Sequence, residues 1–263
     1  MTEELAKRSM ARAHGHNDLE LASRCLTRMK GQFSQQDVAE LNAWRYARSY
    51  ADILDLNRAY LRGQVEICPY FFGPVYGETL PALPTLLRLH DYGMLSIDSQ
   101  PARTIAPNWD QCHCCDEWWW FQSRQRAYLT FMIPKNKDLI NPAELLRFIV
   151  HLTTDSRIYA SVEDGKSGCT GLPQKWSTHK KKKARTAEAI DHAEAHYEQR
   201  LVLDAKLASE LAGRHLFLFN ETGALETAEL FTVNVLARGW GEMDLPAVVE
   251  QAAIASGLKP AFQ

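Results

Sequence analysis

The residues with the clearest chemical potential are oxygen-bearing side chains at the two ends of one short segment, ETLPALPTLLRLHDYGMLSIDSQPA, residues 78–102. Glu78 and Thr79 precede a leucine-rich helix, and Ser96 and Ser99 belong to the strand after it. A helix of about 12 residues is ~18 Å long, so a strand that returns beside it can bring its own end next to the start of the helix. Hydroxyl groups near free backbone N–H groups suit a carboxylate or ribose ligand. This segment is therefore our first candidate for a binding site.

The same segment also has a purely structural interpretation. Thr79 could cap the helix, Pro81 could occupy its first turn, and Gly93 could end it in left-handed geometry. The strand would then cover residues 94–98, with a turn from Ser99 onward. The sequence leaves both interpretations open.

A cysteine cluster, Cys112, Cys114 and Cys115, is the strongest metal signal in the chain. Zinc requires four ligands in tetrahedral geometry, and neighbouring residues of an extended segment point to opposite sides. The cluster would need a further ligand from elsewhere, and the paired C-x2-C pattern is absent. We expect no required metal or cofactor, and keep the three cysteines as weak candidates.

Catalytic motifs are missing from the sequence. It contains no G-x-S-x-G, P-loop, G-x-G-x-x-G or H-E-x-x-H pattern. The adjacent acids at 116–117 and 163–164 are typical of solvated strand ends. With no evident base or nucleophile, we expect a protein that is not an enzyme.

A basic run, Lys180 to Lys183, raises the question of nucleic-acid binding. Bases of a single strand stack on aromatic side chains, and Trp176 is the single aromatic residue close to the run in sequence. We therefore expect the lysines to lie in a solvated loop, within a flexible segment at about 164–183, and nucleic acid to be an unlikely partner.

The elements that must position these residues are interspersed helices and strands. We predict helices over 34–63, 79–92, 141–152, 184–212 and 244–256, and strands at 94–98, within 118–133, at 157–163, 215–220 and 229–237. No regular βαβ alternation appears. The pattern favours an α+β fold with mixed or antiparallel sheets side by side and peripheral helices. We expect residues 1–33 to form a helical arm and residues 34–263 to form a single domain.

Bulk composition restricts the class of protein. The 263 residues can bury a substantial core, and a net charge of −2 argues against a general nucleic-acid or membrane coat. No run approaches the ~20 apolar residues of a membrane span. Six cysteines without dense spacing favour a reducing compartment, so we expect an intracellular, cytoplasmic protein without membrane contact.

The segment from Gly77 to Ala102 resembles the C-terminal regulatory domain of eukaryotic methylenetetrahydrofolate reductases. In that family an acidic–threonine pair opens a leucine-rich helix, which ends at a glycine and leads into a Thr-Ile-Asn-Ser-Gln-Pro strand. YLRGQVEICPY resembles the family's preceding strand, and WWWFQSRQRAYLTFMI its aromatic strand. The resemblance covers residues 44–163, and it also extends to short bacterial domains.

The resemblance implies an α+β module that binds S-adenosylmethionine. Glu78, Thr79, Ser96 and Ser99 occupy its ligand-contacting positions, and Thr222 and Thr227 are candidates for the rest of the pocket. The family's catalytic barrel has no room in 263 residues, so folate reduction is not predicted.

Three functions follow as hypotheses. The first is a non-catalytic module that binds S-adenosylmethionine or a related nucleoside and acts on a protein partner or within a homo-oligomer. The second is a structural or interaction protein that kept the fold without the ligand and uses Trp118 to Trp120 as a contact face. The third is a small enzyme acting on a nucleoside.

Overall fold

The structure of the protein, a computed structural model, contains helices and two four-stranded antiparallel sheets. It describes residues 24, 27–28, 30–69, 71, 73–75, 77–111, 118–164, 175–184, 195–201, 216 and 218–262. Within these residues every strand pairing is antiparallel. The prediction of an α+β fold is confirmed. The division at residue 33 stays a prediction, although Arg28 is buried against Asp37 and Glu66 of the following domain.

The first sheet forms the centre of the molecule, in the strand order β1-β4-β8-β5. Its strands are β1 (Leu95–Gln100), β4 (Tyr128–Pro134), β5 (Ile158–Asp164) and β8 (Leu230–Ala237). The two central strands, β4 and β8, are almost continuously buried, as expected for strands with neighbours on both sides.

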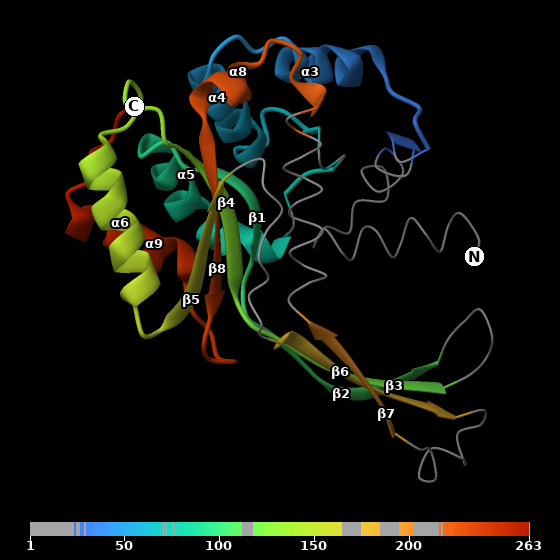
Figure 1. Ribbon diagram of the computed structural model, residues 1–263. Helices are drawn as coiled ribbons and strands as arrows, with labels where there is room; N and C mark the ends of the chain where they lie inside the picture. The colour runs from blue at the N-terminus through green and yellow to red at the C-terminus, as the bar shows by residue number, and fades with distance from the viewer. Residues whose placement is uncertain are drawn as a thin grey trace.

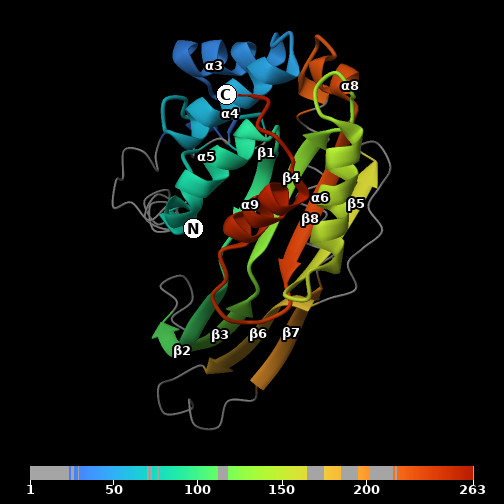
Figure 2. The same ribbon diagram turned by 90° about the vertical axis from the view of Figure 1, so that its left-hand side faces the viewer.

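Helices α5 (Leu83–Asp91), α6 (Pro142–Thr154) and α9 (Leu245–Ser256) cover one face of this sheet (Figures 1 and 2). The core lies between them, where Phe131 of β4 and Phe148 of α6 are fully buried with ring centres 6.4 Å apart. The ends of α6 and α9 follow local signals. Asn141 caps α6 before a proline, Asp244 caps α9, and Gly257 ends α9 at φ +73°.

Helices α3 (Gln35–Arg45), α4 (Tyr50–Leu61) and the short α8 (Ala224–Ala228) group at one end of the sheet (Figure 1). The single helix predicted for residues 34–63 is wrong in one respect, because the chain breaks between α3 and α4. Ser34–Asp37 and Ser49–Asp52 each form a complete capping box, so a second helix starts where we expected the first to continue.

The second sheet has the order β2-β3-β6-β7 and extends beyond one end of the first (Figure 1). Its strands are β2 (Arg103–Gln111), β3 (Trp118–Gln125), β6 (Lys175–Ala184) and β7 (Ala195–Leu201). The chain enters it after β1 and returns from β3 to β4, so the aromatic run at 118–133 supplies a strand to each sheet.

Several predictions about these later segments are wrong. The loop predicted for 164–183 includes β6, and the helix predicted for 184–212 includes β7. Leu216, Leu218 and Phe219 are helical rather than part of a strand at 215–220. Earlier in the chain, the strand that the resemblance implies within residues 60–70 is replaced by an isolated bridge between Cys68 and Phe71. Pairing with distant strands outweighed local preference in β6 and β7.

Candidate ligand-binding site

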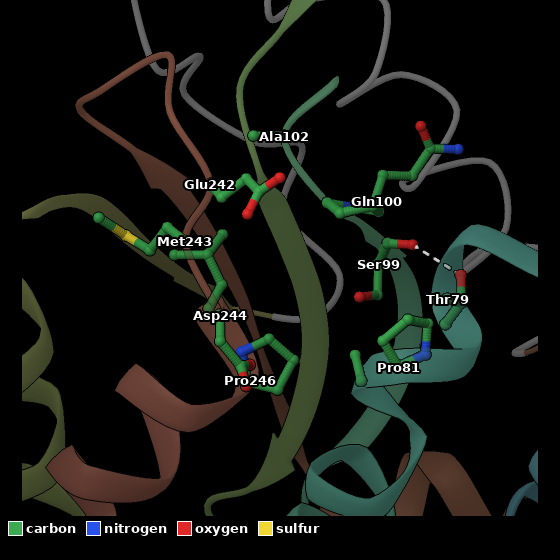
Figure 3. A pocket seen from close by; sticks show the side chains of 12 residues that line it. Thr79, Pro81, Ser99, Gln100, Ala102, Glu242, Met243, Asp244 and Pro246 are labelled. Carbon is green, nitrogen blue, oxygen red and sulfur yellow. Dashed lines mark hydrogen bonds between the residues drawn. The ribbon is translucent and has the colours of Figure 1, made fainter. Parts of the chain in front are cut away.

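A cavity of about 680 Å³ lies where the end of β1 meets the segment that leads into α9 (Figure 3). One wall comes from the 3-10 helix η1 (Gly77–Ala82) and the end of β1, and the other from the residues just before and at the start of α9. The lining residues are Thr79, Pro81, Ala82, Ser99, Gln100, Pro101, Ala102, Glu242, Met243, Asp244, Leu245 and Pro246.

Two of the candidate residues, Thr79 and Ser99, meet at this cavity. The Thr79 hydroxyl donates a hydrogen bond to the backbone carbonyl of Ser99 over 3.4 Å. Gly93 makes this return possible because its φ of +76° ends α5 and turns the chain directly into β1. Helix and strand therefore bring two residues that are twenty positions apart into one wall.

Thr79 does not cap α5, contrary to the structural interpretation of the sequence. The chain first forms η1, with Pro81 inside it, and α5 begins at Leu83 after Ala82, which makes no side-chain capping bond. Thr79 bonds to β1 instead. This hydrogen bond therefore stabilises the cavity wall and does not cap the helix.

The opposite wall supplies the charge of the cavity. Glu242 is exposed, and Asp244 accepts a hydrogen bond from the backbone N–H of Ala247 as the cap of α9. Figure 3 shows the Glu242 carboxylate across the cavity from Ser99 and Thr79. Among the described lining residues these two acids are the charged ones, so the cavity favours a ligand with positive charge.

The other predicted site residues lie elsewhere or are only partly described. Glu78 belongs to η1 next to Thr79, and its side chain lies outside the described residues. Ser96 is buried, with its carbonyl and hydroxyl 3.0 and 3.4 Å from Nδ2 of Asn57. A bulge between Ser96 and Asp98 shifts the register of β1, and Ser96 does not line the cavity.

Thr222 lies just before α8 and Thr227 lies within it, and neither residue lines the cavity. The Thr222 hydroxyl bonds to the carbonyl of Ala47, and the Thr227 hydroxyl bonds to the carbonyl of Gly223 over 3.0 Å. Both hydroxyls serve the local structure around α8. Of the six predicted residues, Thr79 and Ser99 line the cavity. Glu78 lies next to Thr79 in η1.

Glu242 and Asp244 are the functional candidates that sequence reasoning missed. The sequence marks Asp244 as a helix start, but nothing in its neighbourhood links it to the segment at 78–102. These two acids reach the cavity because α9 packs against α5. One contact between the two helices is the ion pair of Arg88 and Glu250, with 2.6 Å between nitrogen and oxygen. A sequence pattern alone carries no sign of that contact.

The metal candidates Cys112, Cys114 and Cys115 lie outside the described residues. Cys68, which is described, is buried with its thiol 3.4 Å from the carbonyl of Phe71. Within the described part of the chain, no helix is both long and apolar enough to cross a bilayer.

Comparison with known proteins gives one partial similarity. The chain is 28% identical over 122 residues to methylenetetrahydrofolate reductase 2 of Saccharomyces cerevisiae. The match covers 44% of this chain and 20% of the yeast protein, so the chain corresponds to about a fifth of that relative. No family model matches the sequence. The chain is therefore similar, over part of its length, to a methylenetetrahydrofolate reductase.

Proposed function

We propose that the protein is a non-catalytic module that binds S-adenosylmethionine, or a related nucleoside, in the cavity between η1, β1 and α9. The observation that carries this proposal is that Thr79 and Ser99 form one wall of a cavity whose other wall presents Glu242. Bound ligand would be signalled to a protein partner or a second copy of the chain.

The chemistry of the cavity matches that of the ligand. S-adenosylmethionine has a sulfonium and an ammonium group, which two carboxylates attract. Its ribose hydroxyls can bond to the Ser99 and Gln100 region of β1, and its adenine can pack on apolar lining such as Pro81 and Met243. A mixed lining of this kind, with a few polar groups in an apolar cavity, is typical of small-molecule sites.

The resemblance of residues 77–102 to the regulatory domain of methylenetetrahydrofolate reductases supports the same ligand class. The partial match to the yeast protein supports a relation to these reductases in general. That resemblance brings the contribution of Glu78 into the proposal, because Glu78 is adjacent to Thr79 in η1.

The test is thermal unfolding of the full chain with increasing S-adenosylmethionine. A ligand that binds the native state stabilises it by RT ln(1 + [L]/Kd), so millimolar ligand should raise Tm if Kd is micromolar. S-adenosylhomocysteine, which lacks the sulfonium charge, should give a smaller shift. Absence of any shift at millimolar S-adenosylmethionine would contradict the proposal.

Variants distinguish the geometry of the cavity from general ligand effects. Thr79→Val and Glu78→Ala should reduce the shift, whereas Thr227→Val, which removes a hydroxyl of the same type outside the cavity, should preserve it. Unfolding of each variant without ligand controls for a loss of stability. An equal loss for Thr79→Val and Thr227→Val would place the ligand elsewhere.

A further inference from the structure

The lysine run and the tryptophan-rich segment are neighbours in the second sheet. β6 pairs with β3 so that Trp119 is opposite Lys183 and Trp120 is opposite Lys182. On the far side of β3, Trp120 is opposite Trp109 of β2. Along the sequence, Trp176 is the single aromatic residue near the lysines, which we expected to lie in a loop. The strand pairing brings several aromatic positions to them.

Register divides this sheet into two faces, since residues directly opposite one another share a face and alternate residues along a strand share a face. Positions in register with Trp120 define what we call the aromatic–lysine face. Its members are Thr104, Trp109, Gln111, Trp118, Trp120, Gln122, Arg124, Thr178, Lys180, Lys182, Ala184, Ala195, Tyr197 and Gln199.

The two faces differ in their acidic positions rather than in their basic ones, since Lys181, Lys183 and Arg200 belong to the opposite face. The aromatic–lysine face contains four aromatic positions and three basic ones, and it contains no acidic position among the paired residues. The acidic positions of the sheet, Asp110 and Glu198, are in register with Trp119 and His179 and therefore belong to the opposite face. A surface with this composition complements a polyanion with flat aromatic groups.

Among the described elements, the four strands of this sheet have their main contacts with one another, and no described helix covers either of its faces (Figures 1 and 2). Neighbouring strands are about 4.8 Å apart, so Trp109 and Trp120 hold adjacent positions across the sheet. Adjacent aromatic positions on an antiparallel sheet are one way in which proteins stack successive bases.

We propose that the aromatic–lysine face binds single-stranded nucleic acid, with bases stacked at the tryptophan positions and phosphates paired with Lys180, Lys182 and Arg124. This inference is independent of the nucleoside cavity, which is built from other elements. A lipid surface fits less well, because insertion requires a continuous apolar face and Gln111 and Gln122 interrupt this one.

The direct test is fluorescence anisotropy of the full chain with labelled 20-nucleotide single strands of mixed sequence. Separate DNA and RNA arms distinguish the two sources of the same chemistry, and a duplex of the same sequence controls for general phosphate attraction. We expect single strands to bind with Kd in the micromolar range at 50 mM salt, about 10⁻⁶ to 10⁻⁴ M, and more tightly than the duplex. Three phosphate contacts predict roughly a 20-fold loss of affinity between 50 and 200 mM salt.

Alternation along β6 provides a matched pair of variants. Lys180→Gln with Lys182→Gln removes two charges from the aromatic–lysine face, and Lys181→Gln with Lys183→Gln removes two from the opposite face. The first pair should lower affinity about 10-fold at low salt and reduce the salt dependence, while the second should have at most a 2-fold effect.

Tryptophan variants test stacking in the same way. Trp120→Ala should weaken binding about 5- to 150-fold, Trp120→Phe should largely restore it, and Trp119→Ala on the opposite face should leave it within 2-fold. Circular dichroism melting of each variant shows whether the fold is kept, and Trp120→Phe serves as the test if Trp120→Ala does not fold.

Three outcomes would overturn the inference. They are absence of single-strand binding at 50 mM salt, equal losses for the two lysine pairs, and equal affinity for single strand and duplex. Competition by an acidic peptide as effective as that by the oligonucleotide would also overturn it, by indicating a protein partner.

Discussion

The side-chain amide of Asn57 on α4 donates a hydrogen bond to Nε2 of His90 on α5, with 3.1 Å between the two nitrogens and both residues fully buried. The roles are fixed by the other ring nitrogen, which lies 2.9 Å from the carbonyl of Leu86 and must donate to it. The same amide donates to the carbonyl of Ser96. One neutral imidazole thus helps to join α4, α5 and β1 behind the wall of the cavity.

Because His90 must stay neutral, the protein should lose stability in acid below about pH 6.5. Burial lowers the pKa of His90 from 6.5 to about 3, and the charges of Arg58 and Arg62 add to this effect against the opposing hydrogen bond to Leu86. The unfolded state binds the proton first, so stability is complete above pH 6.5 and falls as pH decreases toward 3, by up to about 1.4 kcal/mol per pH unit. Urea unfolding at pH 7, 6, 5 and 4 measures this slope.

Replacement of His90 itself provides the control for that experiment. His90→Gln should be less stable than the wild type at pH 7 and lose less stability on acidification. If His90→Gln does not fold, the ring protons of His90 in the NMR spectrum should show no titration between pH 8 and 5. A His90 signal that titrates near pH 6.5 would contradict the prediction.

Gly93 should be much less tolerant of alanine than Gly63. Both residues have left-handed φ, +76° and +70°, so each substitution introduces backbone strain of about 1 kcal/mol. A Cβ at Gly93 would lie 2.7 Å from the ring of Phe262, whereas nothing is within 4 Å of one at Gly63. We expect Gly93→Ala to cost about 1–3 kcal/mol more than Gly63→Ala in chemical denaturation. Adding Phe262→Ala should recover part of that difference, and no recovery would show that the ring is not the cause.

Asn220 should be essential for the attachment of α8 to the end of α3. Its amide nitrogen donates to the carbonyls of Trp44 and Ala47 over 3.0 and 3.2 Å, and its oxygen accepts from the N–H of Ala224 over 3.0 Å. Since Asn220 is buried, Asn220→Ala leaves several polar groups unsatisfied and should cost about 2–4 kcal/mol of unfolding free energy. Asn136→Ala, at a half-buried turn residue whose two side-chain hydrogen bonds are exposed to solvent, should cost less than about 1 kcal/mol. Similar costs for the two would indicate that the buried network is not strong.

The sequence predicted the elements whose limits are set by local chemistry. Caps, prolines and a terminal glycine define α6 and α9, and these helices were expected within two residues. The second capping box, Ser49–Asp52, was equally visible but lay within a longer apolar repeat. β6 could not be recognised in this way, because a lysine run has little preference for a strand and becomes one by pairing with β3. β7 was hidden for a similar reason, since it becomes a strand by pairing with β6.

In the candidate site, too, the residues positioned by local geometry could be predicted and those positioned by tertiary packing could not. Thr79 and Ser99 lie within one continuous helix–turn–strand segment, so their meeting could be predicted from helix length and a glycine turn. Glu242 and Asp244 reach the cavity through α9, whose position depends on tertiary packing. The hydrogen bonds between Asn57 and Ser96 could not be predicted from the sequence either, because a bulge in β1 changes which side chains share a face of the strand.

The charge of Glu242 should distinguish S-adenosylmethionine from its uncharged sulfide. Glu242 is exposed, and a single exposed ion pair has a modest effect. Glu242→Gln should therefore weaken S-adenosylmethionine roughly 2- to 5-fold and S-adenosylhomocysteine less, as measured by isothermal titration calorimetry. Asp244→Asn preserves the cap of α9, because asparagine is also a good capping residue, and in combination with Glu242→Gln it should increase the loss. Asp138→Asn removes one exposed carboxylate that does not line the cavity and should leave both affinities unchanged. Equal effects of Glu242→Gln on the two ligands would mean that the sulfonium group does not lie beside this carboxylate, and the acidic wall would then have another role.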